Sequence, residues 1–277
     1  MLNYKCEQSS SIRIVSKGVH MASNKTVEKT LKILQLISKY SEGITLSEIH
    51  KKLNLPKATV FDILQALYKE DAIYYKDQYL KTYVIGSKIF AIGQAYTKNS
   101  NFINFASQGL KDFANKHNLT VFACKRLGEK VIYIYKYESL KTRISTNDIG
   151  IQMPLHINAA GKAFLAFARG AKKDELMEKV LTSEFDGFAN EKYQQLEAEL
   201  LEYEKQGYVL DNGVTENYIC TYAVPVYNFE DKNVGVLSAA RIANNESDSD
   251  IIDEINELKE IAKYVSMRQG YHEQSNK

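Results

Sequence analysis

One short segment carries residues whose types suit anion binding. Asn158, Ala159, Ala160 and Gly161 open a predicted helix over residues 158–167 and bring almost no side chain to its first turn. Such a start leaves backbone N–H groups at the positive end of the helix dipole, which suits a carboxylate or a phosphate. Close packing of the helix against a sheet explains the same small residues equally well, so both interpretations stay open.

A second candidate is a nucleophile and its base. Cys220 and His156 supply the groups of a thiol–imidazole pair, although buried structural roles are commoner for each. Cys6, Cys124 and Cys220 lie far apart, with no Cys/His cluster at zinc spacing. The sequence also lacks Gly-x-Gly-x-x-Gly, a P-loop and His-Glu-x-x-His. We therefore expect no catalytic residue, no metal, no cofactor, and reduced thiols in a cytoplasmic chain.

The third candidate is a set of mostly polar and charged side chains. Most of them lie on one predicted helix, and the others lie before it and in the hairpin after it. The apolar residues of this helix, Val60, Ile63, Leu64 and Leu67, follow helical spacing, so the residues between them face outward. Lysines there suit phosphates, and hydroxyl or amide groups suit base edges. Any single member is as readily a solvated surface residue, and only the set indicates DNA. The candidates for DNA contact are Thr45, Lys57, Thr59, Phe61, Asp62, Gln65, Lys76 and Lys81.

The charge distribution agrees with a polyanionic partner for the first part of the chain. The 277 residues have a formal net charge of +2. Residues 21–100 hold 12 lysines, no arginine and 7 acidic residues, a net charge of +5, whereas residues 101–277 have a net charge of −5. A basic block followed by an acidic block suggests two different partners, although chance scatter of a few lysines remains the alternative.

The elements around the outward-facing helix have the order of a winged helix-turn-helix. A helix is expected over residues 26–39, with Val27, Leu31, Leu34 and Ile37 on its apolar stripe. Residues 45–48 have the form of a capping box for a second, short helix, and Pro56 suits the first position of the third. Two strand-forming stretches follow, residues 73–75 and 79–85, with a turn predicted at 76–78. A hairpin in this place is a wing.

The second part of the chain predicts an α+β domain with a mostly antiparallel sheet. Strands are expected over residues 120–126, 131–137, 208–210, 218–227 and 234–240. Helices are expected over residues 102–117, 158–167, 172–180, 191–206 and 250–268. Adjacent strands joined by short turns favour this class over a doubly wound sheet.

Length and segment composition set the expected domains. We expect a tail at residues 1–22, disordered or a cloning scar, then a winged helix-turn-helix at 23–86, a linker helix at 87–101 and a second domain at 102–271. Met21 could be the true start of the protein. The longest apolar runs are only a few residues, so we expect no membrane span.

Residues 26–86 resemble the DNA-binding half of the IclR family of bacterial transcription regulators. The matching stretches are TLKILQLI, ITLSEIHKKLNLPKATV, LQALYKEDAI and YVIG. The resemblance continues, in the family's order, through MPLHINAAGKAFLA, KQGYVLDNG and YICTYAVPV. It therefore covers about residues 24–270.

The resemblance implies a winged-helix DNA-binding domain, a linker helix and a GAF-like effector-binding domain. It also implies that the protein assembles as a homodimer or homotetramer. It points to the backbone of Ala159 and Ala160 and to Asp211, Cys220 and Ser238 as polar groups of an effector pocket, with Met153 as an apolar wall. The implied partners are a double-stranded DNA operator and a small organic acid.

Two positions depart from the family's pattern. Asp62 stands where many members have arginine, so the common arginine–guanine contact is absent and the operator sequence does not carry over. Ala240 stands where some members have a serine, so one hydroxyl is missing from the expected pocket.

We interpret the chain as a sequence-specific DNA-binding transcriptional regulator, with repression as the expected sign and a small organic acid as its effector. The main rival is an enzyme acting on a small acid, with a winged helix that binds another protein. A second rival is a structural DNA-binding protein without a ligand.

Overall fold

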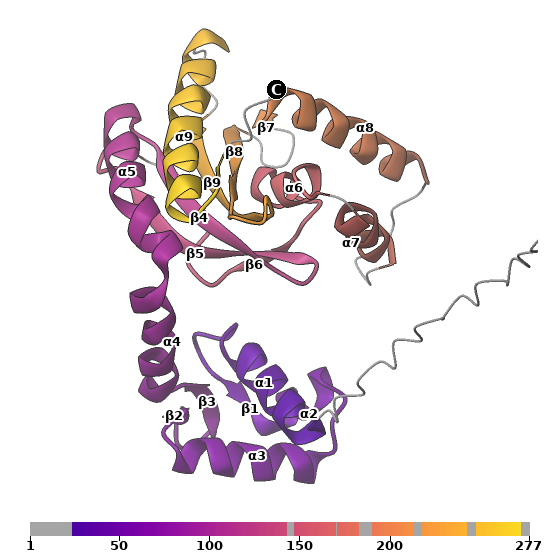
Figure 1. The fold of residues 1–277 in the computed structure, drawn as a ribbon. Helices are drawn as coiled ribbons and strands as arrows, with labels where there is room; N and C mark the ends of the chain where they lie inside the picture. The colour runs from indigo at the N-terminus through magenta and orange to yellow at the C-terminus, as the bar shows by residue number, and fades with distance from the viewer. Residues whose placement is uncertain are drawn as a thin grey trace, which may run out of the picture. The chain divides into compact units, whose positions relative to one another are not determined.

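The computed structural model describes residues 24–142, 147–169, 171–182, 190–212, 218–242 and 248–272. The predicted tail at residues 1–22 lies outside this part of the chain. The structure divides into two compact units, Met1–Ala95 and Tyr96–Lys277, and each is described by itself (Figure 1). Within the described residues, no helix combines the length and the apolar character that crossing a membrane requires.

The first unit is a winged helix-turn-helix, as predicted. Its elements are α1 (Lys25–Ile37), β1 (Ile44–Thr45), α2 (Leu46–Lys52), α3 (Lys57–Lys69), β2 (Ile73–Asp77) and β3 (Thr82–Ile85), followed by α4 (Ser87–Asn99), which continues past the boundary between the units. The strands form a small antiparallel sheet in the order β1-β3-β2. One core joins these elements, with Ile33, Ile49, Val60 and Leu64 fully buried.

The predicted capping box starts α2. The Thr45 hydroxyl accepts a hydrogen bond from the Glu48 amide at 3.3 Å, and the Glu48 carboxylate accepts one from the Thr45 amide at 2.8 Å. This arrangement satisfies two amides that a helix start would otherwise leave open. Residues 53–56 then lead into α3, which packs against α2. This contact leaves the other side of α3 exposed.

Three expectations for the first unit need correction. Val27 and Leu31 are 53% and 56% exposed, because α1 buries only the side of the helix that carries Ile33 and Ile37. The wing turn spans residues 78–81 instead of 76–78, since the Asp77 carboxylate accepts hydrogen bonds from the Tyr79 and Leu80 amides. The strand β1 was not predicted, because two residues carry no periodicity.

The second unit has α+β architecture, and this class was predicted. Its elements are α5 (Asn101–His117), β4 (Thr120–Leu127), β5 (Lys130–Glu138), β6 (Gln152–Pro154), α6 (Ala159–Ala166), α7 (Ala171–Thr182), α8 (Asn190–Gln206), β7 (Val209–Asn212), β8 (Ile219–Tyr227), β9 (Asn233–Ile242) and α9 (Asp248–Arg268). The sheet has the order β6-β5-β4-β9-β8-β7, and each of its pairings is antiparallel. The short edge strand β6 was not predicted.

Helices cover both faces of this sheet (Figure 1). α5 and α9 pack side by side on one face, over a core that includes Leu110, Val121 and Leu258. α6, α7 and α8 cover the other face, over a core that includes Phe122, Phe164 and Leu200. Since successive side chains of a strand point to opposite faces, each central strand contributes to both cores.

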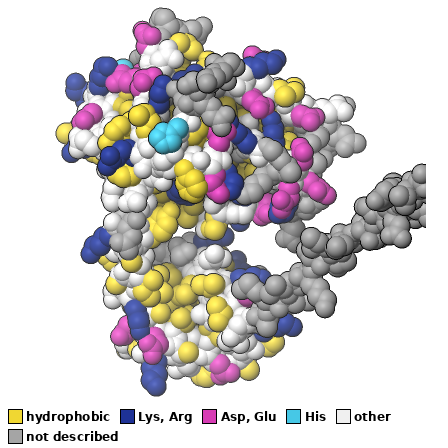
Figure 2. Space-filling model, viewed as in Figure 1, with side chains coloured by type: hydrophobic (Ala, Val, Ile, Leu, Met, Phe, Trp, Pro, Cys, Tyr) yellow, Lys and Arg dark blue, Asp and Glu magenta, His cyan; other side chains and the backbone are white. Residues whose placement is uncertain are grey.

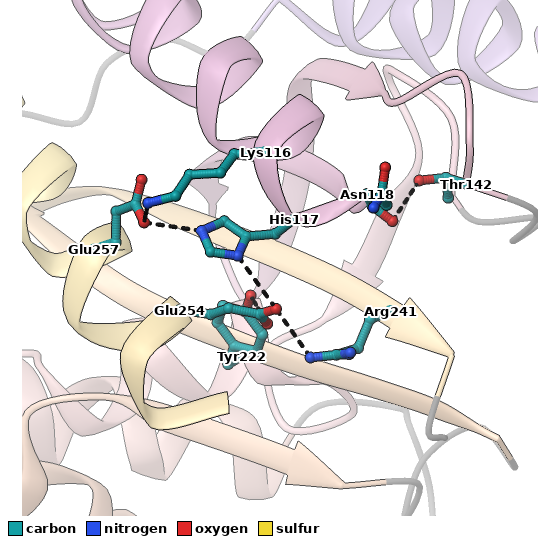
Figure 3. A network of polar contacts seen from close by, with 8 residues as sticks. All are labelled: Lys116, His117, Asn118, Thr142, Tyr222, Arg241, Glu254 and Glu257. Carbon is teal, nitrogen blue, oxygen red and sulfur yellow. Dashed lines mark hydrogen bonds and ion pairs between the residues drawn. The ribbon is translucent and has the colours of Figure 1, made fainter. Parts of the chain in front are cut away.

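A buried polar network ties the first of these faces together (Figure 3). The Glu254 carboxylate of α9 accepts a hydrogen bond from the Tyr222 hydroxyl at 2.8 Å and from the Arg241 guanidinium at 3.0 Å. His117, at the end of α5, places Nδ1 3.6 Å from Glu254 and Nε2 2.8 Å from Glu257. Glu254 is 5% exposed, so it joins a helix, two strands and a second helix away from water.

We predict that Glu254→Ala lowers the free energy of unfolding by about 3 kcal/mol, because it removes a buried carboxylate that pairs with Arg241 and accepts a hydrogen bond from Tyr222. Glu257→Ala is the matched control on the same helix. The Glu257 side chain is 35% exposed and pairs with the solvent-exposed Lys116 and with His117, so its loss should cost less, about 1 kcal/mol. Urea unfolding followed by circular dichroism measures both. Equal losses for the two variants would show that the network around Glu254 has no special role.

Candidate functional site

The outward face of α3 carries most of the residues predicted to contact DNA. Lys57, Asp62 and Gln65 are exposed, Phe61 is 50% exposed, and Thr59 is half-buried. On the opposite side of the helix, Val60 and Leu64 are fully buried. The helix therefore presents a cation, a hydroxyl, an aromatic ring, a carboxylate and an amide together, which is a set able to meet both phosphates and base edges.

The remaining predicted DNA contacts lie in different surroundings. The Thr45 hydroxyl is engaged in the capping box of α2. Lys76 belongs to β2, where its ammonium pairs with the Glu42 carboxylate at 2.7 Å and donates to the Ser41 carbonyl at 3.0 Å. Lys81 is exposed in the wing turn and has a left-handed φ of 51°. Of these three side chains, Lys81 is the one presented freely to solvent.

The wing also presents two apolar side chains that sequence reasoning missed. Tyr79 is 99% and Leu80 69% exposed at the tip of the hairpin. The base of the wing packs against α3 through tilted aromatic rings, because the centroid of Tyr75 lies 5.0 Å from that of Tyr68 and 4.8 Å from that of Tyr83. This contact joins the wing to α3.

A pocket opens on the sheet face covered by α6. The space within it, with its open mouth included, is about 490 Å³. The first turn of α6 forms one wall, and five neighbouring strands form the rest. The lining residues are Phe122, Tyr133, Asn147, Asn158, Ala159, Ala160, Asp211, Ile219, Thr221, Ser238 and Ala240.

The α6 wall of the pocket is a helix N-terminus. Asn158 caps it by accepting a hydrogen bond from the Gly161 amide at 2.9 Å. The amides of Ala159 and Ala160 lie in the first turn, where the helix offers them no acceptor, and both residues line the pocket. Gly161 has a separate role, since a Cβ there would lie 2.4 Å from the Leu155 carbonyl oxygen. The close-packing interpretation therefore holds for Gly161, and anion binding at Ala159 and Ala160 stays a prediction.

Acidic and hydroxyl groups lie on the strands of the pocket. Asp211 and Ser238 are each 4% exposed, and Thr221 lies directly opposite Asp211 in the sheet. Burial, together with the Glu199 and Asp211 carboxylates, raises the pKa of the Tyr203 hydroxyl to about 12. The Tyr203 phenol, which does not itself line the pocket, therefore stays neutral well above neutral pH.

Tyr133 was not predicted from the sequence, and Asn158 was predicted only as the start of a helix, yet both line the pocket. The Tyr133 hydroxyl accepts hydrogen bonds from Asn158 Nδ2 at 3.1 Å and from Asn147 Nδ2 at 3.3 Å. Met153, predicted as an apolar wall, is half-buried beside this group, and its Sδ lies 3.3 Å from Asn158 Nδ2. It therefore supports a lining residue and does not itself line the pocket.

Cys220 needs correction as a pocket residue. Its strand neighbours Ile219 and Thr221 line the pocket, so alternation turns Cys220 to the opposite face, into the core under α5 and α9. Burial raises the pKa of its thiol to about 11, which keeps it protonated. His156 lies in the turn before α6, on the pocket face, so the structure does not bring the candidate nucleophile and base together. Among the described residues, no group of three His, Cys, Asp or Glu side chains suits a metal ion.

Two family models match the chain. The model described as the IclR helix-turn-helix domain matches residues 26–77, and the model described as the bacterial transcriptional regulator IclR C-terminal domain matches residues 94–267. Together they cover both units of the structure.

Curated relatives carry regulator names. The HTH-type transcriptional regulator XynR of Escherichia coli K12 is 25% identical over 246 residues, which cover 89% of this chain and 97% of XynR. The HTH-type transcriptional repressor AllR of the same organism is 30% identical over 139 residues, about half of each chain.

Solved structures agree with the fold. An IclR transcriptional regulator from Alicyclobacillus acidocaldarius has a TM-score of 0.75 at 26% identity, covering 88% of this chain and 98% of that one. An IclR homologue from Microbacterium hydrocarbonoxydans, complexed with 4-hydroxybenzoate, has a TM-score of 0.71 at 16% identity, covering 88% and 99%. At that identity the likeness concerns the fold alone. The helix-turn-helix unit, the pocket-bearing second unit and the two matched models together establish that this chain belongs to the IclR family of bacterial transcriptional regulators.

Proposed function

We propose that this regulator is a repressor that binds its operator through α3 and the wing, and that a small organic acid in the pocket of the second unit modulates this binding. The observation that carries the proposal is the pocket itself. It sets open amides at the start of α6 against the buried Asp211 and Ser238. Repression is the proposed sign because the relative AllR is named a repressor.

The DNA contact proposed here depends on lysines and on the face of α3. Lys57 lies in the first turn of α3, where the helix dipole also favours a phosphate. Base edges would be contacted by Thr59, Phe61, Asp62 and Gln65, which would determine the DNA sequence that is bound. Lys81 would contact the flanking phosphate backbone of the DNA. Asp62 accepts hydrogen bonds and repels phosphate, so its proposed partner is a cytosine amino group.

The residues that line the pocket limit the class of acid that it can bind. A carboxylate of the ligand would accept hydrogen bonds from the Ala159 and Ala160 amides. Asp211 accepts hydrogen bonds when ionised, so it favours a ligand with a hydroxyl or amino donor at its other end. The fold relative from M. hydrocarbonoxydans holds such a molecule, 4-hydroxybenzoate. We therefore propose a hydroxy or amino acid of small size over a plain alkanoate.

The apolar surface of the first unit supports assembly into a homodimer, or a homotetramer made of two dimers. Val27 and Leu31 on α1 are more than half exposed, and Figure 2 shows apolar side chains gathered on the face of this unit that carries α1. Phe90 and Ile92 on α4 are 66% and 63% exposed. A second copy of the chain would cover such surface. The acid would then shift the populations of dimer arrangements that do or do not match the operator half-sites.

The proposed DNA contact predicts that operator binding depends on salt concentration. In a gel shift on the DNA upstream of the chain's own gene, binding should weaken steeply between 50 and 200 mM salt, as counterion release requires. Lys57→Ala should weaken binding and lower the slope of log affinity against log salt by about one. Asp62→Ala should change sequence preference with the slope unchanged. No binding at low salt, or binding indifferent to salt, would contradict the proposed function.

The second prediction concerns the pocket. Asp211→Asn and Ser238→Ala should each weaken acid binding about tenfold or more, because each removes a hydrogen-bonding group that faces the ligand. Cys220→Ala is the control, since it lies on the opposite face of the sheet and should leave acid binding unchanged. Calorimetric titration with the acid that best raises the melting temperature of the wild type measures all three. Unchanged affinity in the first two variants would remove these residues from the site.

The third prediction concerns assembly. Leu31→Asp places a charge on the exposed apolar face of α1 and should shift the protein from dimer to monomer at micromolar concentration. Glu28→Lys, on the same helix, changes charge without altering the apolar surface and should leave the dimer intact. Sedimentation velocity distinguishes the species. A Leu31→Asp protein that stays dimeric would show that this face is not the interface.

A further inference from the structure

Thr120 carries a buried hydroxyl without a partner. It is the first residue of β4 and is 0% exposed. Its Oγ1 has no hydrogen-bond partner in the structure. A buried polar group in this state costs free energy and is rare in folded proteins. We therefore expect the Thr120 hydroxyl to gain a hydrogen-bond partner when a ligand is bound.

The register of the sheet sets Thr120 beside the pocket. Thr120 is directly opposite Ala240, Ala240 is opposite Thr221, and Thr221 is opposite Asp211. The four residues thus form one row across β4, β9, β8 and β7. The other three members of the row line the pocket, and Thr120 continues the row by one strand.

The direction of the Thr120 side chain follows from the alternation along β4. Phe122, two residues further on, lines the pocket, whereas Val121 packs in the core under α5 and α9. Thr120 therefore shares the pocket face with Phe122. Opposite residues in an antiparallel pair have Cβ atoms about 4.5–5.5 Å apart, and Ala240 carries nothing beyond its Cβ. Thr120 is fully buried and does not line the pocket as it stands, so a ligand would reach its hydroxyl by extending over Ala240 toward β4.

We infer that Thr120 is a ligand-binding residue of the pocket, whose hydroxyl donates a hydrogen bond to an oxygen of the bound acid above Ala240. This inference rests on the proposed function and narrows the class of acid expected in the pocket. The acid must carry an oxygen acceptor at the position above Ala240, two strands away from Asp211. A carboxylate, keto or hydroxyl oxygen satisfies this requirement, and an unbroken hydrocarbon segment at that position does not.

The test uses Thr120→Val, which keeps the shape of the side chain and removes the hydroxyl. In the free protein, this variant should melt at or above the wild-type temperature, because it removes an unsatisfied buried group. Thr142→Val is the control for the loss of a threonine hydroxyl that has a partner, at a partly exposed position. The Thr142 hydroxyl donates to the Asn118 carbonyl at 2.8 Å, so its loss should lower the melting temperature and leave acid binding unchanged.

Acid binding is then measured with a defined probe. Lactate, pyruvate, benzoate and 4-hydroxybenzoate are screened by thermal shift on the wild type, and the acid with the largest shift is titrated by calorimetry. Thr120→Val should bind that acid about tenfold more weakly. A more stable protein with weaker ligand binding is a combination that a purely structural role does not produce.

The outcomes separate this inference from the function on which it rests. If none of the acids shifts the wild type, the proposed acid-binding function is contradicted, and Thr120 loses its role with it. If an acid binds the wild type and Thr120→Val equally, the function stands and the assignment of Thr120 is wrong. A free Thr120→Val protein destabilised as much as Thr142→Val would also overturn the assignment, because the hydroxyl then already has a partner.

Discussion

The alternation of side chains along the antiparallel strands β8 and β9 is the constraint on which the second unit depends. Thr221 and Ala240 face the pocket, and their next neighbours Tyr222 and Arg241 face α9. The proposed ligand on one face and the Glu254 carboxylate on the other would therefore contact adjacent residues of the same strands. A shift of register by one residue would exchange the two faces, so the pocket and the buried network can exist only together.

Short-range patterns explain what the sequence could predict. The helices of the first unit follow from apolar periodicity and from the Thr45–Glu48 capping box, both of which involve residues at most four apart. The strands of the sheet follow from β-forming stretches and turns. β1 and β6 escaped prediction because two or three residues cannot display a period. The wing turn was misplaced because the Asp77 carboxylate, by accepting from two backbone amides, fixes the turn two residues later.

Long-range pairing explains what the sequence could not predict. Ala159, Ala160, Asp211 and Ser238 were expected in the pocket and lie together there. Cys220 was placed on the wrong face, because a resemblance names positions without fixing the direction of each side chain. Alternation from Asp211 and its partner Thr221 could have corrected this, once the pairing of β7 with β8 was known. Tyr133 had no local signal, since its role depends on amide groups 14 and 25 residues away.

The central claim of our account is that acid binding and operator binding are linked in one chain. Thermodynamic linkage then requires that the operator changes the affinity for the acid by the same factor as the acid changes the affinity for the operator. Calorimetric titration of the acid into the protein, with and without a saturating operator duplex, measures this factor directly. We predict a weaker acid affinity in the presence of the duplex, matched by a weaker operator affinity in the presence of the acid. Identical acid affinities in the two titrations would contradict the account.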